Sequence, residues 1–249
     1  MKDLGYERSA HLYDLFDTKD NLRFFQHFVR RSSSVRGPVL DIGAGTGRLA
    51  IPLAEQGACL VCVEPSPAMR AEFQAKLDRR PELCHRIQIV AADAASFDLG
   101  RTYPGAFLSG SFDHFMRRGE RLASLKNIAR HVERGGWLAF DVFLGLMSDA
   151  VLSPAGIAQV GEVTHRRFVA SRVLPEGLIE VTLIFEKAQG DDLLERIEQR
   201  SLAGITTRAE VHELLAEAGF AVQREFGDYQ FSQFRKGDPL LLVEAIREA

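Results

Sequence analysis

Alternating glycines and two separate acids are the residues of this chain best suited to hold a ligand. Gly43, Gly45 and Gly47 alternate within VLDIGAGTGR, at the end of a short apolar run. Glycine accepts positive φ and carries no side chain, so the backbone of such a turn can approach a ligand closely. Glu64 and Asp93 each end a later apolar run, where a carboxylate can accept hydrogen bonds from ribose hydroxyls or from adenine N6. This combination favours a nucleotide-like cofactor.

The spacing of the glycines distinguishes two classes of cofactor. A dinucleotide site needs the pattern G-x-G-x-x-G, whereas this chain has G-x-G-x-G followed by Arg48. The chain also lacks the second nucleotide-binding half that a nicotinamide cofactor requires. We therefore expect a shorter ligand and keep an NAD-dependent oxidoreductase as an alternative. Asp93 has an alternative interpretation too, as the acid of a turn or of a helix N-terminus.

Strands that alternate with helices must position these residues, and this alternation predicts a parallel sheet covered on both faces. Ser66 and Pro67 mark one helix start, as N-cap and first helical residue. Gly135 and Gly136 are expected to end the helix that precedes the fifth strand. The expected strands are 38–43, 59–64, 86–93, 106–112 and 137–143, and the expected helices between them are 48–57, 66–77 and 120–134.

The pattern changes after the fifth strand, where turn signals between strands predict a small antiparallel insertion. Thr207 and Glu210, in capping-box spacing, predict the start of a later helix. Before the core, an amphipathic helix over 21–31 is expected to pack over the open edge of the site. The elements after the fifth strand are three inserted strands (166–173, 178–187 and 193–201), a helix (207–219) and two final strands (221–226 and 240–246).

The composition limits the partners of the chain. Its 249 residues are 46% hydrophobic, and its formal net charge of -3 gives no general attraction for nucleic acid or an anionic membrane. No run approaches the roughly 20 apolar residues that span a bilayer, and the N-terminal stretch is unlike a secretory signal, so we expect a cytoplasmic protein. Cys59 and Cys62 point to opposite faces of a strand, and the histidines have no ligand spacing, so no metal is expected.

Four motifs, VLDIGAGTGR, VEPSPAM, AAD and GGWLAFDVF, resemble in order and spacing the class I S-adenosylmethionine-dependent methyltransferases, from Val39 to the end of the chain. The resemblance implies an α/β fold with a doubly wound, Rossmann-like seven-stranded sheet. Its last strand is antiparallel and inserts beside the fifth, and a small antiparallel insertion follows strand five. The expected domains are an N-terminal helical lid over 1–36 and a methyltransferase domain over 37–249, with the insertion at 160–203.

The same resemblance implies S-adenosyl-L-methionine as the cofactor and assigns its contacts. Tyr13, in the leading stretch, is expected to bind the methionine carboxylate, or otherwise to pack in the lid. Ser109 is also expected to contact the cofactor. The other expected contacts are Gly43, Ala44 and Gly45 at the methionine moiety, Asp41 to orient that region, Glu64 at the ribose, Pro65 and Met69 beside the adenine, and Asp93 with the amide of Ala94 at its edge.

The leading stretch YDLFDTKDNLRFF and the insertion resemble the small-molecule branch, which implies in-line methyl transfer to an N, O or C atom of a small acceptor. His114 is the candidate general base, because histidine titrates near neutral pH; a surface position is the alternative. Residues 109–112 depart from the Asn/Asp-Pro-Pro-Tyr motif of enzymes that methylate base amines, so nucleic acid is not expected as a partner.

Several alternatives stay open at this level. The cofactor could instead supply its aminocarboxypropyl group or be modified itself, or the chain could be a non-catalytic scaffold that binds it. Tyr229, Phe231 and Phe234 are candidates either for the wall of the substrate pocket or for the core. The sequence assigns neither the acceptor nor the oligomeric state.

Overall fold

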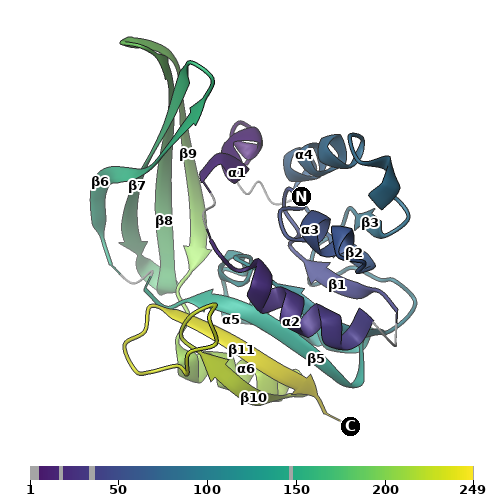
Figure 1. Ribbon diagram of the computed structural model, residues 1–249. Coiled ribbons are helices and arrows are strands. Elements are labelled where there is room, and N and C mark those ends of the chain that lie inside the picture. The colour runs from purple at the N-terminus through teal and green to yellow at the C-terminus, as the bar shows by residue number, and fades with distance from the viewer. Residues whose placement is uncertain (1–5, 17–18, 34–36, 146–147, 249) are drawn as a thin grey trace.

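The computed structural model describes residues 6–16, 19–33, 37–145 and 148–248, which contain two sheets (Figure 1). The central sheet has seven strands in the order β10-β11-β5-β4-β1-β2-β3. Strands β1 to β5 run parallel, and β11 runs antiparallel to both β5 and β10, which confirms the predicted fold class. The strands are β1 (Val39–Ile42), β2 (Leu60–Val63), β3 (Ile87–Val90), β4 (Tyr103–Leu108), β5 (Val132–Phe143), β10 (Phe220–Phe226) and β11 (Leu240–Arg247).

Helices cover both faces of the central sheet. One apolar cluster joins the sheet to α5 and α6, and a second joins it to α2, α3 and α4. Ser66 caps α4 by accepting a hydrogen bond from the Met69 amide at 3.3 Å, and Thr207 caps α6 by accepting one from the Glu210 amide at 3.2 Å, so both predicted starts are confirmed. The helices are α1 (Tyr13–Phe16), α2 (Leu22–Ser33), α3 (Ala50–Glu55), α4 (Pro67–Leu77), α5 (Arg118–His131) and α6 (Arg208–Glu217).

The end of α5 differs from the prediction. The helix ends at His131 and β5 begins at Val132, so Gly135 and Gly136 lie inside the strand and do not cap the helix. Gly135 has a φ of 74°, and the pairing of β5 with β4 shifts register in this region. The positive φ accommodates the irregular pairing of the strand. Glycine is suited to both a helix cap and such a position because it adopts positive φ at little cost.

Two further strands are shorter or shifted relative to the prediction. β3 ends at Val90, so Asp93 follows the strand by three residues and lies in a loop. β4 ends at Leu108, and Ser109 and Gly110 begin the loop that faces the site. Both strand ends therefore deliver polar side chains to the same edge of the sheet.

The second sheet is antiparallel and contains four strands, not the three predicted. Its first strand, β6, was missed because its sequence AVLSPAGIAQV includes proline and glycine and has no alternation of apolar and polar residues. The sheet therefore begins at Ala150, ahead of the predicted boundary at residue 160. It stands apart from the central sheet, and α1 lies between it and α4 (Figure 1). The strands, in spatial order, are β6 (Ala150–Val160), β7 (Val163–Leu174), β8 (Leu178–Gln189) and β9 (Asp192–Gly204).

The sequence had suggested that the helix over 21–31 covers the open edge of the site. In the structure, helix α2 lies instead on a face of the central sheet. The Phe25 ring packs on that of Phe107 at 5.3 Å, and the Phe28 ring packs on that of Trp137 at 5.5 Å. This position buries the apolar face of the helix in the core. The predicted domain boundary after residue 36 falls outside the described residues, and the division into lid and methyltransferase domain stays a prediction. None of the described helices is long and apolar enough to span a membrane.

Candidate functional site

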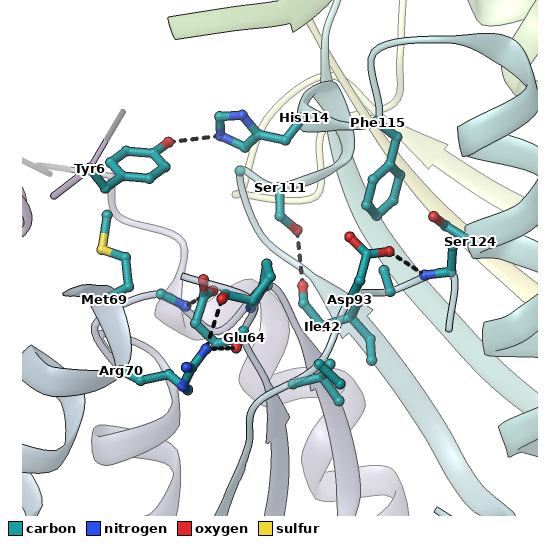
Figure 2. Close-up of a pocket in the computed structure, with 18 of the residues that line it drawn as sticks. Tyr6, Ile42, Glu64, Met69, Arg70, Asp93, Ser111, His114, Phe115 and Ser124 are labelled. Carbon is teal, nitrogen blue, oxygen red and sulfur yellow. Dashed lines mark hydrogen bonds between the residues drawn. The ribbon is translucent and has the colours of Figure 1, made fainter. Parts of the chain in front are cut away.

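A cavity of about 510 Å³ opens beyond the carboxyl ends of the central strands. It lies where strand order reverses, because β1 has β4 on one side and β2 on the other, and ligands of doubly wound sheets bind at such a point. The turn after β1, the ends of β2 and β3, the loop after β4 and the N-terminal segment all contribute to its walls (Figure 2). The predicted residues that line it are Tyr13, Gly43, Gly45, Glu64, Pro65, Met69, Asp93, Ala94, Ser109 and His114.

The three glycines of the turn serve different purposes, and all have positive φ. A Cβ on Gly43 would lie 2.5 Å from the Cβ of Ser111, and a Cβ on Gly47 would lie 2.2 Å from the ring of Phe73. These two glycines permit close packing inside the protein. A Cβ on Gly45 would meet no atom within 4 Å, so its missing side chain leaves open space at the cavity. Gly45 is therefore the glycine that makes room for a ligand.

Glu64 follows β2 and is held rigidly by backbone amides. Its Oε1 accepts a hydrogen bond from the Ser66 amide at 2.7 Å, and its Oε2 accepts one from the Gly45 amide at 2.8 Å. The side chain is buried, and burial raises the pKa of its carboxyl while the two amides oppose this shift. A carboxylate oxygen has two lone pairs, so each oxygen can also accept a bond from a ligand hydroxyl. Figure 2 shows Glu64 beside Arg70, whose Nη1 donates to the carbonyls of Glu64 and Pro65.

Asp93 makes the turn contact of one interpretation and lies at the cavity where the other requires it. Its Oδ1 accepts a hydrogen bond from the Ala95 amide at 2.8 Å, which is the turn contact, and the residue also lines the cavity. The turn fixes the direction of the carboxylate at the end of β3. Ala94 and Met69 line the same cavity, so the residues expected around an adenine ring are brought together.

Asp41 and Ala44 do not line the main cavity. They line an adjacent recess of about 40 Å³, which shares Tyr13, Gly45 and other lining residues with the main cavity. Burial, and next the negative charge of Glu64, raise the pKa of Asp41 to about 8, while Arg48 opposes the shift. Asp41 is therefore mainly protonated at neutral pH in the ligand-free protein.

This pKa predicts how stability varies with pH. An aspartate in the unfolded chain ionises near pH ~3.9, whereas folded Asp41 ionises at about 8. The stabilisation that Asp41 contributes is therefore fully present below the pKa that it has in the unfolded chain, and it is lost as the pH rises through about 8. The asparagine of Asp41→Asn is uncharged at every pH. The Tm of this variant should therefore rise relative to that of the wild type between about pH 5 and pH 9. Thermal unfolding of both chains measures this, and an equal Tm difference at both pH values would contradict it.

The N-terminal segment contributes to the wall of the cavity. Tyr6 lines it and its hydroxyl forms a 2.9 Å hydrogen bond with Nε2 of His114, the predicted general base (Figure 2). Burial raises the pKa of Tyr6, which keeps its hydroxyl protonated. Tyr6 was not predicted from the sequence, because one tyrosine in a charged N-terminal stretch carries no spacing signal.

Contacts on both sides hold α1 in place. Asp14 accepts a 2.6 Å hydrogen bond from the hydroxyl of Thr46 in the glycine turn and pairs with Lys76 of α4. On the other side, the Phe16 ring packs on Phe185 of the second sheet at 5.7 Å. The N-terminal segment is thus attached to the turn that follows β1 and to the antiparallel sheet.

The carboxyl-terminal aromatics do not line the cavity, contrary to one of the two interpretations above. Tyr229 donates a 2.7 Å hydrogen bond to Asp141 and packs near Phe24 of α2. Phe231 and Phe234 line a separate groove beside β10. The missed residues of the main cavity include Phe115, Glu120 and Ser124, which come from the loop after β4 and from α5.

The seven-stranded sheet, with an acid after β2, an acid after β3 and a glycine turn that faces the cavity at Gly45, has the fold of the class I S-adenosylmethionine-dependent methyltransferases. Residues 39–136 match the family model described as a methyltransferase domain, and the chain is an S-adenosylmethionine-dependent methyltransferase. Among the residues the structure describes, no group of three or more His, Cys, Asp or Glu side chains is arranged to hold a metal ion.

Several known proteins are similar to this chain. The cypemycin N-terminal methyltransferase of Streptomyces sp is 29% identical over 181 residues, which cover 67% of this chain and 71% of that protein. The CcbJ methyltransferase of Streptomyces caelestis has a TM-score of 0.84 at 20% identity over the whole of both chains. The sugar N-methyltransferase KedS8 of Streptoalloteichus sp ATCC 53650 has a TM-score of 0.75 at 22% identity, covering 96% of this chain and 92% of that one. These structures share the fold.

Proposed function

We propose that this enzyme transfers the methyl group of S-adenosylmethionine to an amine nitrogen of a small-molecule acceptor. The sulfonium methyl is already activated, so the reaction mainly needs in-line positioning and exclusion of water. A cavity whose walls include Tyr6 and Tyr13 of the N-terminal segment can position the reactants and limit the access of water. Its volume of about 510 Å³ lies in the range of small-molecule sites.

The proposed cofactor orientation follows from the lining acids. The adenine lies near Asp93, Ala94 and Met69, the ribose hydroxyls bind Glu64, and the methionine moiety lies along the turn at Gly45. These assignments use the residues that share the cavity, and they leave one end of it for the acceptor. His114, Tyr6, Phe115 and Glu120 line the cavity and remain for that end.

The observation that favours an amine is the chemistry of this remaining end. Glu120 brings a carboxylate there, and the ring faces of Tyr6 and Phe115 attract a cation. Arg70 is the one cation among the described residues that line the main cavity, and its guanidinium donates to carbonyls beside Glu64. A protonated amine is therefore attracted to the acceptor end, and a neutral hydroxyl is not. The relatives named above include a sugar N-methyltransferase and an N-terminal methyltransferase, which supports the same acceptor class.

His114 is proposed to remove the proton that the amine must lose before or during transfer. The Tyr6 hydroxyl, at 2.9 Å from Nε2, orients the imidazole. In this proposal the Tyr6 hydroxyl positions His114, while its ring contacts the acceptor. A cytoplasmic location and the absence of a nucleic-acid partner stay predictions of the sequence.

Matched acceptors test the proposal. We expect release of S-adenosylhomocysteine to be stimulated by amino sugars and by peptides with a free N-terminus, with a mass increase of one methyl group in the product. The matched alcohols, in which a hydroxyl replaces the amine, should give no stimulation above the background rate. Equal methylation of amine and alcohol would contradict the assignment of nitrogen, and release of methylthioadenosine would indicate transfer of the aminocarboxypropyl group.

A further inference from the structure

The recess beside the main cavity is a separate polar compartment at the glycine turn. Its volume of about 40 Å³ is sufficient for a small polar group. Tyr13, Gly43, Gly45 and Ser109 line both the recess and the main cavity, so a ligand lying along the turn can reach it. The polar side chains that line it are Tyr13, Asp41, Thr46, Arg48 and Ser109.

Arg48 gives the recess a positive charge. It follows the last glycine of the turn and lies two residues before α3, and it is the one cation among the described residues that line this recess. The raised pKa of Asp41 leaves that side chain mainly uncharged at neutral pH, so it does not cancel the charge of Arg48 in the ligand-free protein. A small anionic group is the natural occupant of such a compartment.

The guanidinium is held from a second element. Nη1 of Arg48 donates a 2.8 Å hydrogen bond to Oδ1 of Asn21, which directly precedes α2 and is fully buried. Nδ2 of Asn21 donates in turn to Oγ of Ser109 at 2.8 Å. A cation oriented in this way before the ligand arrives loses less side-chain entropy on binding.

We propose that Arg48 binds the carboxylate of the methionine moiety of the cofactor, with Asn21 as its positioning residue. Once the ribose is at Glu64, the amino-acid end of the cofactor runs along the glycine turn toward the recess. Arg70 lies beside the ribose position and donates to the carbonyls of Glu64 and Pro65, so it does not serve the amino-acid end. A guanidinium matches a carboxylate with two parallel hydrogen bonds. The inference rests on the cofactor and is independent of the acceptor.

Two ligands separate this role from a general effect on the site. S-adenosylhomocysteine carries the amino-acid carboxylate, whereas 5′-methylthioadenosine has the same adenosine without it. We expect Arg48→Met to weaken S-adenosylhomocysteine binding by roughly 10- to 100-fold, the loss typical of hydrogen bonds to a charged group, and to leave methylthioadenosine binding unchanged. Isothermal titration calorimetry of the full chain with each ligand gives the ratio of the two dissociation constants.

Arg70→Met is the matched control, since it removes a cation from the ribose side and should leave that ratio unchanged. Arg48→Gln keeps an amide donor for Asn21 and gives the same readout where Arg48→Met does not fold. An unchanged ratio in the folded Arg48 variant would overturn the proposal, whether both affinities fall together or neither changes. Failure of the wild-type chain to bind either ligand would count against the cofactor itself, a distinct outcome.

Discussion

Glu64→Ala should weaken the binding of S-adenosylhomocysteine by roughly 100-fold or more. The variant removes the acceptor proposed for two ribose hydroxyls, and hydrogen bonds to a charged group contribute about 1.5–3 kcal/mol each. It also releases the amides of Gly45 and Ser66, which Glu64 holds at 2.8 and 2.7 Å. The turn then loses the anchor that places its backbone against the ligand. Calorimetric titration measures the affinity, and thermal unfolding measures the accompanying loss of stability.

Glu244→Ala provides the matched control for this variant. Glu244 is also a buried glutamate of the central sheet, 3% exposed, but it lies on β11 and pairs with Arg31 away from the cavity. Its replacement should lower the Tm without changing the affinity for S-adenosylhomocysteine. If the two variants lower affinity equally, the effect of Glu64 is a general effect on stability and its assignment to the ribose is wrong.

Gly47→Ala should mainly lower stability and Gly45→Ala should mainly lower cofactor affinity, although the residues are two positions apart. The Cβ that Gly47→Ala adds would lie 2.2 Å from the ring of Phe73, so overpacking and a φ of 76° together should cost about 3 kcal/mol. For a chain of this length, that loss lowers the Tm by roughly 6–12 °C. Gly45→Ala meets no protein atom within 4 Å, so it should cost only about 1–2 kcal/mol of backbone strain. Its methyl group occupies ligand space and should lower cofactor affinity at least about tenfold.

Gly57→Ala controls for the backbone strain alone. Gly57 has a φ of 96°, no atom lies within 4 Å of its added Cβ, and it is remote from the cavity. It should resemble Gly45→Ala in stability and the wild type in affinity. Thermal unfolding and titration of the three variants measure both quantities. If Gly45→Ala binds the cofactor as well as Gly57→Ala does, Gly45 does not make room for the ligand.

The parts of the fold that the sequence predicted correctly are those that local chemistry determines. The Ser66 and Thr207 caps each depend on one side chain and one amide three residues later, and both occur. The glycine turn and the acid after β2 likewise depend on strand ends that short apolar runs define. Sequence therefore places Gly45 and Glu64 at the same edge of the sheet without any knowledge of long-range packing.

Features that depend on distant partners could not be predicted in this way. Gly135 was expected to end a helix, but its positive φ serves the register shift between β4 and β5, which involves a strand about 30 residues earlier. Tyr6 becomes part of the site only because the N-terminal segment folds back to meet His114. Asn21 fixes the guanidinium of Arg48 through a hydrogen bond, and nothing in the local sequence around either residue indicates this contact.

The attachment of α1 on two sides has a kinetic consequence. The helix is tied to Thr46 and Lys76 through Asp14, and to the second sheet through Phe16. Tyr13 of this helix lines both the cavity and the recess, so we expect the segment to move and the polar contacts of Asp14 to break when the spent cofactor departs. We therefore expect departure of the product, which includes opening of α1, to be slower than methyl transfer and to set the turnover rate.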